Sequence, residues 1–216
     1  MKSFLMAAAL LLGSLAQASL LTFEQGTLQL DNVNLSKSAT VNDSNGTPTT
    51  LKMDLLGAGL RSKTVLFVAA KVYVIQLFSD NKPAFARDAN ALTSLVNNSK
   101  MIALKITMLR TVDASSLAVS FKEALQANGY AIDSDLAAML NIVEKGAAGT
   151  QGKELTMLMV KDQAGKINFY YQDAAGKQQS LSGSGELGAK VMSIWLGKPA
   201  DDGLAKTKEQ LLKPVY

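Results

Sequence analysis

The residues best suited to chemistry in this sequence are Arg61 and Tyr73, which flank a stretch rich in apolar residues. A guanidinium group carries a permanent charge and pairs two-to-two with a carboxylate. Buried without a partner it would be costly, so an arginine beside apolar chain needs a fixed anion. That anion could be a ligand carboxylate, with the Tyr73 hydroxyl adding a hydrogen bond, or an internal acid such as Asp54, Glu24 or another. Arg61 could also simply lie exposed.

Two glycines, Gly57 and Gly59, come shortly before the arginine. Glycine there permits either a positive φ or the close approach of another backbone. The pair lacks the third glycine and the following helix of a dinucleotide-binding fingerprint. On the local sequence alone, the pattern favours a tight bend or a bulge in a strand.

The composition of the chain excludes several kinds of catalytic and metal-binding site. The 216 residues contain no cysteine and no histidine, which excludes disulfides, thiol nucleophiles, Cys/His zinc sites and histidine-based catalysis. A hydrophobic content of 48% suits one globular domain with a sizeable core. The net charge of +4 is spread over scattered basic residues, so we expect no nucleic-acid binding. No cofactor is indicated.

The N-terminus is typical of a secretory signal. A lysine is followed by an apolar run over residues 4–12 and by the small-x-small pattern of residues 16–18. We predict a signal peptide over residues 1–18 and a single domain over residues 19–216. The run is short for a membrane span of roughly 20 residues, so we expect no stable span once the signal is removed. The expected location is the periplasm of a Gram-negative bacterium.

Hydrophobic periodicity predicts strands and helices in alternating blocks. Strands are predicted over residues 20–30, 38–41, 51–55, 64–78, 101–109, 154–160, 166–171 and 177–181. Helices are predicted over residues 89–96, 113–129, 133–146, 187–196 and 204–212. Residues 64–78 could form one long bent strand or two. The order predicts an α+β fold, an antiparallel sheet with helices packed to one side.

Three blocks of the sequence resemble the chalcone isomerase superfamily, and most closely its bacterial secreted members. The blocks are residues 57–63 (GAGLRSK) with 71–73 (KVY), residues 106–110 (ITMLR) with Phe121 and Leu125, and residues 193–199 (SIWLGKP) with 211–212. Together they cover roughly residues 51–212. The resemblance implies an open-faced β-sandwich, in which a large antiparallel sheet carries a layer of helices on one side, with a ligand cleft between.

The superfamily contains plant isomerases that close a chalcone to a flavanone, and plastid fatty-acid-binding proteins without that activity. In the latter, an arginine and a tyrosine hold the fatty-acid carboxylate, and by position these match Arg61 and Tyr73. In the isomerases, a threonine five residues before the matching tyrosine helps to position a catalytic water, and here that position is Val68. A catalytic tyrosine expected near the start of the next helix has no counterpart in residues 113–117. The resemblance therefore favours binding over catalysis.

We expect non-catalytic binding of a fatty acid or a similar amphipathic carboxylate in an apolar cleft, with Arg61 as the anchor and Tyr73 assisting. The nearest apolar candidates for the cleft lining are Val65, Phe67, Val72 and Ile75. One alternative is an intramolecular lyase of the chalcone–flavanone isomerase type, in which Arg61 is catalytic and stabilises a developing oxyanion. Another is an envelope protein-interaction module whose cleft takes a partner peptide.

Three other side chains near these blocks are open to a structural or a functional interpretation. We expect Lys63 and Lys71 to be solvated, although Lys71 could approach the cleft. Trp195 shares the apolar face of a predicted helix with Val191 and Ile194, which is typical of a tryptophan packed in the core.

Overall fold

The computed structural model of the chain describes residues 18–65 and 68–215. The strands are β1 (Leu21–Leu30), β2 (Val33–Asn42), β3 (Pro48–Val65), β4 (Val68–Ser79), β5 (Met101–Met108), β6 (Glu154–Lys161), β7 (Ile167–Gln172) and β8 (Gln178–Gly183). The helices are α1 (Ala91–Asn98), α2 (Ala114–Ala127), α3 (Ser134–Glu144), α4 (Leu187–Leu196) and α5 (Asp202–Leu211), with a 3-10 turn at Lys82–Ala84. The predicted signal peptide lies outside the described residues, apart from its last residue.

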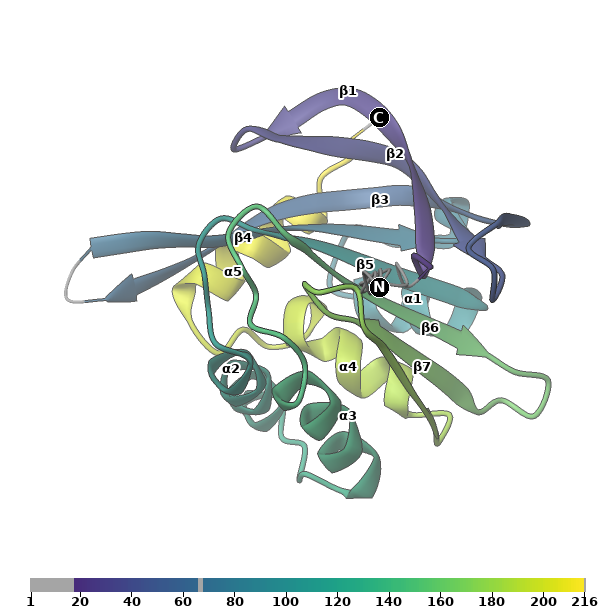
Figure 1. The fold of residues 1–216 in the computed structure, drawn as a ribbon. Helices are drawn as coiled ribbons and strands as arrows, with labels where there is room; N and C mark the ends of the chain where they lie inside the picture. The colour runs from purple at the N-terminus through teal and green to yellow at the C-terminus, as the bar shows by residue number, and fades with distance from the viewer. Residues whose placement is uncertain (1–17, 66–67, 216) are drawn as a thin grey trace, which may run out of the picture.

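The strands form one eight-stranded sheet in the order β1 to β8, in which every neighbouring pair is antiparallel. Helices α2, α3 and α4 cover one face of it (Figure 1). Strand β5 shows how the sequence directs this packing, because Ile102, Leu104 and Ile106 alternate and are all buried in the core under the helices. The predicted α+β class and the open-faced sandwich are confirmed.

The other face of the sheet is partly covered by its own first two strands. Strands β1 and β2 curl over the middle of the sheet (Figure 1) and bury a second apolar cluster that includes Met53, Phe78 and Ala103. Buried hydrogen bonds fix the curl, since the Gln76 side chain accepts from the Ser36 amide at 2.7 Å. The sheet therefore has a helix face and a face that the β1–β2 hairpin closes.

Residues 64–78 are not one long strand. Strand β3 runs to Val65 and pairs with Val68 at the start of β4, so the two strands form a hairpin. Only Leu66 and Phe67, outside the described residues, separate them. Neither is a residue type that signals a turn, because short hairpin connections usually carry glycine, asparagine or aspartate. The local sequence therefore contains no turn signal at the reversal between β3 and β4.

The two glycines serve a close approach between backbones. On Gly57 a Cβ atom would lie 2.0 Å from the carbonyl oxygen of Leu211, and on Gly59 it would lie 2.8 Å from that of Thr207. Both contacts are with α5, which therefore lies directly against β3. Neither glycine has a positive φ, although a register shift between Leu55 and Gly57 places a bulge just before them. The sequence allowed either a positive φ or a close approach of another backbone at these glycines, and the structure shows the close approach.

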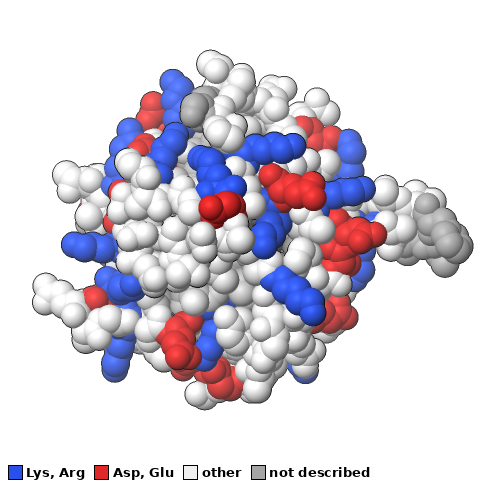
Figure 2. Space-filling model, turned by 180° about the vertical axis from the view of Figure 1, so that it is seen from behind, with Lys and Arg blue, Asp and Glu red and all other residues white. Residues whose placement is uncertain are grey.

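The surface shows interspersed charges. On the face in Figure 2, Lys and Arg side chains alternate with Asp and Glu, and neither sign forms a continuous field. Among the described residues, no helix is long and apolar enough to cross a membrane.

Candidate functional site

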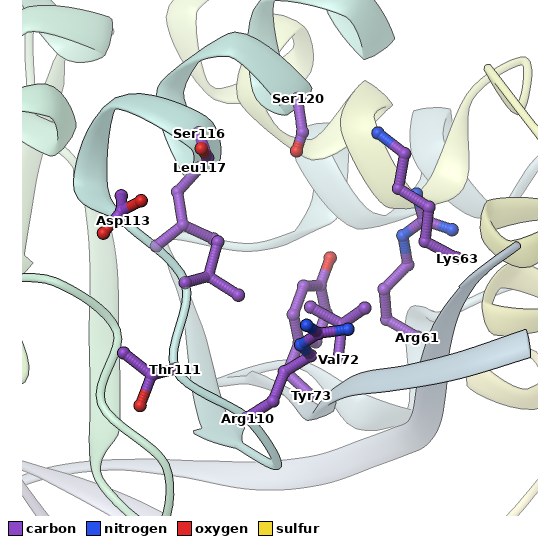
Figure 3. A pocket seen from close by; sticks show the side chains of 11 residues that line it. Arg61, Lys63, Val72, Tyr73, Arg110, Thr111, Asp113, Ser116, Leu117 and Ser120 are labelled. Atoms are coloured by element: carbon purple, nitrogen blue, oxygen red, sulfur yellow. The ribbon is translucent and has the colours of Figure 1, made fainter. Parts of the chain in front are cut away.

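A cavity of ≈ 280 Å³ opens at one end of the helix layer, where strands β3 and β4 meet helix α2. Strand residues on its wall are Arg61, Lys63, Val72 and Tyr73. The segment after β5 and the first turns of α2 supply Arg110, Thr111, Val112, Asp113, Ser116, Leu117 and Ser120. Figure 3 shows Arg61, Tyr73 and Ser120 pointing toward the same space. Charged and hydroxyl-bearing side chains surround the cavity, and Val72, Val112 and Leu117 add apolar surface between them.

A β-bulge at Val72 shapes the strand wall. Arg61 pairs with Tyr73 and Ser62 pairs with Lys71, so Val72 has no partner of its own on β3. Consecutive strand residues normally face opposite sides, and a bulge re-aims one of them. For this reason Val72 and Tyr73 both line the cavity, while Lys71 lies on the opposite face of the sheet.

Arg61 is buried and ion-paired with an acid far away in the sequence. Its Nη1 and Nη2 atoms donate to the two carboxylate oxygens of Asp201 at 2.7 and 2.6 Å, and Nη1 also donates to the carbonyl of Ser62. The side chains are 6% and 39% exposed, respectively. Burial alone would raise the pKa of Asp201, but hydrogen bonds from Arg61 and from the Leu204 amide outweigh it and hold that pKa below its usual range. The internal acid that the sequence left open is therefore Asp201.

The ion pair occupies one edge of the Arg61 guanidinium. Of its five N–H groups, both on Nη1 and one on Nη2 donate to Asp201 or Ser62. The Nε hydrogen and the second Nη2 hydrogen do not take part in these bonds, and Arg61 has a hydrogen-bonding interaction with the Tyr73 phenol. Asp201 lines a small neighbouring void of ≈ 10 Å³ and not the main cavity. Arg61 thus lies between its internal counter-ion and the cavity, with the rest of its guanidinium interacting with Tyr73.

Tyr73 offers a second donor at the same place. Its hydroxyl oxygen accepts a hydrogen bond from Trp195 Nε1 at 2.9 Å, and no described residue accepts its proton. Burial raises the pKa of Tyr73, while the hydrogen bond from Trp195, the charge of Arg61 and a hydrogen bond from Arg61 oppose that rise without reversing it. The phenol is therefore neutral at physiological pH and can donate to an oxygen atom in the cavity. Trp195 in turn is fixed by an edge contact with Phe121, at a centroid distance of 5.3 Å.

The rim of the cavity is positively charged. Lys63 and Arg110 are exposed and form no ion pair with a described residue. Asp113 is the one acidic side chain among the lining residues, against three basic ones, so a cavity ligand meets net positive charge even with Arg61 paired. Concentrated charge of one sign at a cleft attracts a ligand of the opposite sign.

Helix α2 adds hydroxyl groups opposite the strands. Ser116 and Ser120 are four residues apart and so lie on one face of the helix, and that face lines the cavity. Leu117 lies between them and is buried in the core. Among the described residues, no three His, Cys, Asp or Glu side chains gather in a way that could hold a metal ion. The site is therefore equipped to hydrogen-bond an anionic or polar group beside an apolar wall.

Comparison with known proteins agrees with this architecture. A family model described as chalcone isomerase-like matches residues 27–213. The chain belongs to the chalcone isomerase-like family. Among solved structures, the fold is similar to that of a fatty-acid binding protein of Arabidopsis thaliana, with a TM-score of 0.59 and 16% sequence identity over 88% of this chain and 96% of that chain. No curated protein sequence gives a significant match.

The structure brings together some of the residues expected from the sequence of this chalcone isomerase-like chain and separates others. Arg61 and Tyr73 are cross-strand neighbours at the cavity, and Val72 lines it. Ile75 does not, because it lies wholly within the core under the helices. The side chains of Val65 and Phe67 lie outside the described residues. Whether Arg61 and Tyr73 hold a ligand stays a prediction.

Several site residues of this family member were missed by the sequence argument. Lys63 was expected to be merely solvated, and Arg110 was only part of a resembling block, yet both lie at the cavity. Trp195 is in the core as expected, but it also positions the Tyr73 hydroxyl. Asp201 could have been found as the N-cap of the last helix, since it accepts from the Leu204 amide. No local pattern pairs it with Arg61.

Proposed function

We propose that this chalcone isomerase-like protein is a periplasmic, non-catalytic binder of a fatty acid or a similar amphipathic carboxylate. The edge of the Arg61 guanidinium that does not pair with Asp201, together with the Tyr73 hydroxyl, would hold the carboxylate. The observation that carries the proposal is that Arg61 and Tyr73 lie together at a positively charged cavity that also exposes the apolar side chains of Val72, Val112 and Leu117. An arginine fork and a neutral phenol are donors suited to a carboxylate.

The size of the cavity favours a short or medium acyl chain. Ligand pockets usually enclose roughly 300–1,000 Å³, and ≈ 280 Å³ is at the lower end of that range. Val72, Val112 and Leu117 offer apolar surface to the first part of the chain. Burial of each methylene group contributes about 0.8 kcal/mol, so affinity should rise with chain length until the tail leaves the cavity.

Titration with dodecanoate and dodecanol tests the anchor, because the two ligands share a tail and differ in the carboxylate. A charge-assisted hydrogen bond contributes about 1.5–3 kcal/mol, so dodecanoate should bind roughly 10- to 100-fold more tightly. Arg61→Met should remove most of that difference. Lys122→Met, on the exposed side of α2, is the matched control and should keep it. Equal affinity for acid and alcohol in the unmodified protein would refute the carboxylate anchor.

The location and the natural ligand are tested together in cells. Protein recovered from the periplasm should begin at Ser19, as N-terminal sequencing would show, and organic extraction should release an acyl acid detectable by mass spectrometry. Recovery only as the uncleaved chain in the cytoplasm contradicts the location. Absence of any acid from protein that also fails to bind added dodecanoate contradicts the ligand.

A further inference from the structure

A second, larger groove lies on the sheet face opposite the helices. It has a volume of ≈ 570 Å³ and is enclosed by the β1–β2 hairpin on one side and by β4, β5 and the start of β6 on the other. It shares no lining residue with the cavity at Arg61. The lining is mostly polar, in contrast to the apolar cluster that fills the rest of this face. We refer to it as the hairpin groove.

The floor of the hairpin groove is formed by the part of strand β5 where the residues on this face change from apolar to polar. Ala103 belongs to the apolar cluster, but the next residues on the same face are Lys105 and Thr107. Lys105 has a side chain only 5% exposed, and its Nζ atom lies 2.9 Å from a carboxylate oxygen of Glu154. The same Nζ atom lies 4.5 Å from the centre of the Phe23 ring. The buried ammonium group is thus held by two contacts and has donor capacity left.

Thr107 places a hydroxyl group beside this lysine without a partner on the protein. Its Oγ1 atom is buried and makes no hydrogen bond to a described residue. An unsatisfied buried polar atom costs about 1–3 kcal/mol, and since Thr107 lines the groove, a ligand that bonds this hydroxyl would remove that cost. Lys105 and Thr107 therefore give the floor two adjacent groups able to bind an oxygen atom.

The walls of the groove carry amide side chains that make no hydrogen bonds to the described part of the protein. Gln25, Asn32 and Gln151 line the groove and are exposed, and their side chains make no hydrogen bond to described residues. The pairing of β1 is interrupted between Gln25 and Gln29, so this wall is not closed by a regular ladder. Each free amide offers both a donor and an acceptor.

The charges of the hairpin groove cancel. Lys105 pairs with Glu154, and Lys71 pairs with Asp31 at the hairpin turn. An anion would meet the two carboxylates and a cation would meet the two lysines, whereas hydroxyl groups can donate to the acids and accept from the lysines and amides. We propose that the hairpin groove binds a neutral, hydroxyl-rich ligand, namely a saccharide of one or two units. This inference does not depend on the cavity at Arg61.

A titration followed by ¹⁵N–¹H NMR tests the proposal on the mature chain. The probes are glucose, N-acetylglucosamine, maltose and trehalose, each taken to tens of millimolar. At least one should shift the amide signals of Lys105, Thr107 and Gln151 and leave that of Ser120, which lines the cavity at Arg61, in place. The double variant Gln25→Ala/Gln151→Ala should lose at least fivefold in affinity. It should keep its thermal midpoint, because neither side chain contacts the fold through a hydrogen bond.

A second variant separates binding from folding. Thr107→Val keeps the side-chain shape and removes the unsatisfied hydroxyl, so it should fold at least as stably as the natural chain while binding the saccharide more weakly. Gln126→Ala, at an exposed position on α2, is the control and should change neither property. The proposal is overturned if no saccharide of the set shifts these signals. It is also overturned if only sulfate or ammonium does so, or if the saccharide shifts cavity signals instead.

Discussion

Replacing Asp201 by asparagine separates the two roles of the Arg61 ion pair. Asparagine is as good an N-cap as aspartate, so the hydrogen bond to the Leu204 amide, 2.8 Å long in the natural chain, can persist. The substitution removes the negative charge that faces the Arg61 guanidinium, and the Arg61 side chain is only 6% exposed. Asp202→Asn is the matched control, because it removes one charge from the same helix turn at an exposed position without an ion pair among the described residues.

The expected loss of stability follows from the burial of the pair. Removing one partner of a fully buried ion pair costs about 3–5 kcal/mol. Asp201 is 39% exposed, and solvent screening reduces such contributions, so we expect about 2 kcal/mol. For a domain of this size that lowers the thermal midpoint by about 4–8 °C. Asp202→Asn should lower it by no more than a degree or two.

The same substitution should tighten ligand binding. Two carboxylates on different edges of one guanidinium lie roughly 6 Å apart, so their repulsion is on the order of 1–3 kcal/mol at an effective dielectric constant of about 20–40. Without it, dodecanoate should bind Asp201→Asn at least fivefold more tightly by calorimetry, and should restore its thermal midpoint. A variant with intact circular dichroism and unchanged or weaker affinity would refute the reasoning, because Arg61 would then be a purely structural residue.

The pH dependence of the pair has a definite sign. The pKa of Asp201 is lower in the folded chain than its ordinary value of 3.8, so below that value the unfolded chain binds more protons than the folded one. The contribution of Asp201 is therefore complete above pH 3.8 and is lost as the pH falls toward the lower, folded value. Urea unfolding at acidic pH should show this loss in the natural chain, and less of it in Arg61→Met.

Three other expectations can be checked with single experiments. Gly57→Ala places a methyl group 2.0 Å from the Leu211 carbonyl and should cost about 3 kcal/mol in chemical unfolding; a loss below 1 kcal/mol contradicts the close packing of α5. Trp195→Phe removes the donor to the Tyr73 hydroxyl and should weaken dodecanoate binding severalfold, with dodecanol binding as the reference. Burial raises the pKa of both Tyr73 and Tyr171, so two of five tyrosines should resist ionisation in an absorbance titration until alkali unfolds the chain.

The parts of the fold that follow from local periodicity were predictable. The alternation of Ile102, Leu104 and Ile106 gave strand β5 and its core-facing side, and Asp133 caps α3 through the Leu136 amide as expected. Each of these signals is complete within a few residues of sequence. For that reason the sheet, the helix order and the α+β class could be derived without the structure.

The contacts that define the site are not local, which is why sequence reasoning found only some of them. Arg61 and Asp201 are 140 positions apart, and either residue alone is compatible with exposure. The bulge at Val72 changes which side chains face the cavity, yet it has no characteristic residue type. The sequence left the choice between one long strand and two over residues 64–78 undecided for the same reason.

The pattern of Gly57, Gly59 and Arg61 now has a physical explanation. These alternate residues lie on one face of β3, where the glycines admit the backbone of α5 and Arg61 reaches its N-cap. Docking of α5 alone does not need the charge, because the Gln210 side chain already accepts from the Leu60 amide, and well-packed apolar residues often replace a buried ion pair without loss of stability. Under the proposed function the charge of Arg61 has a use, because the guanidinium lines the cavity beside Tyr73 and would hold the ligand carboxylate there.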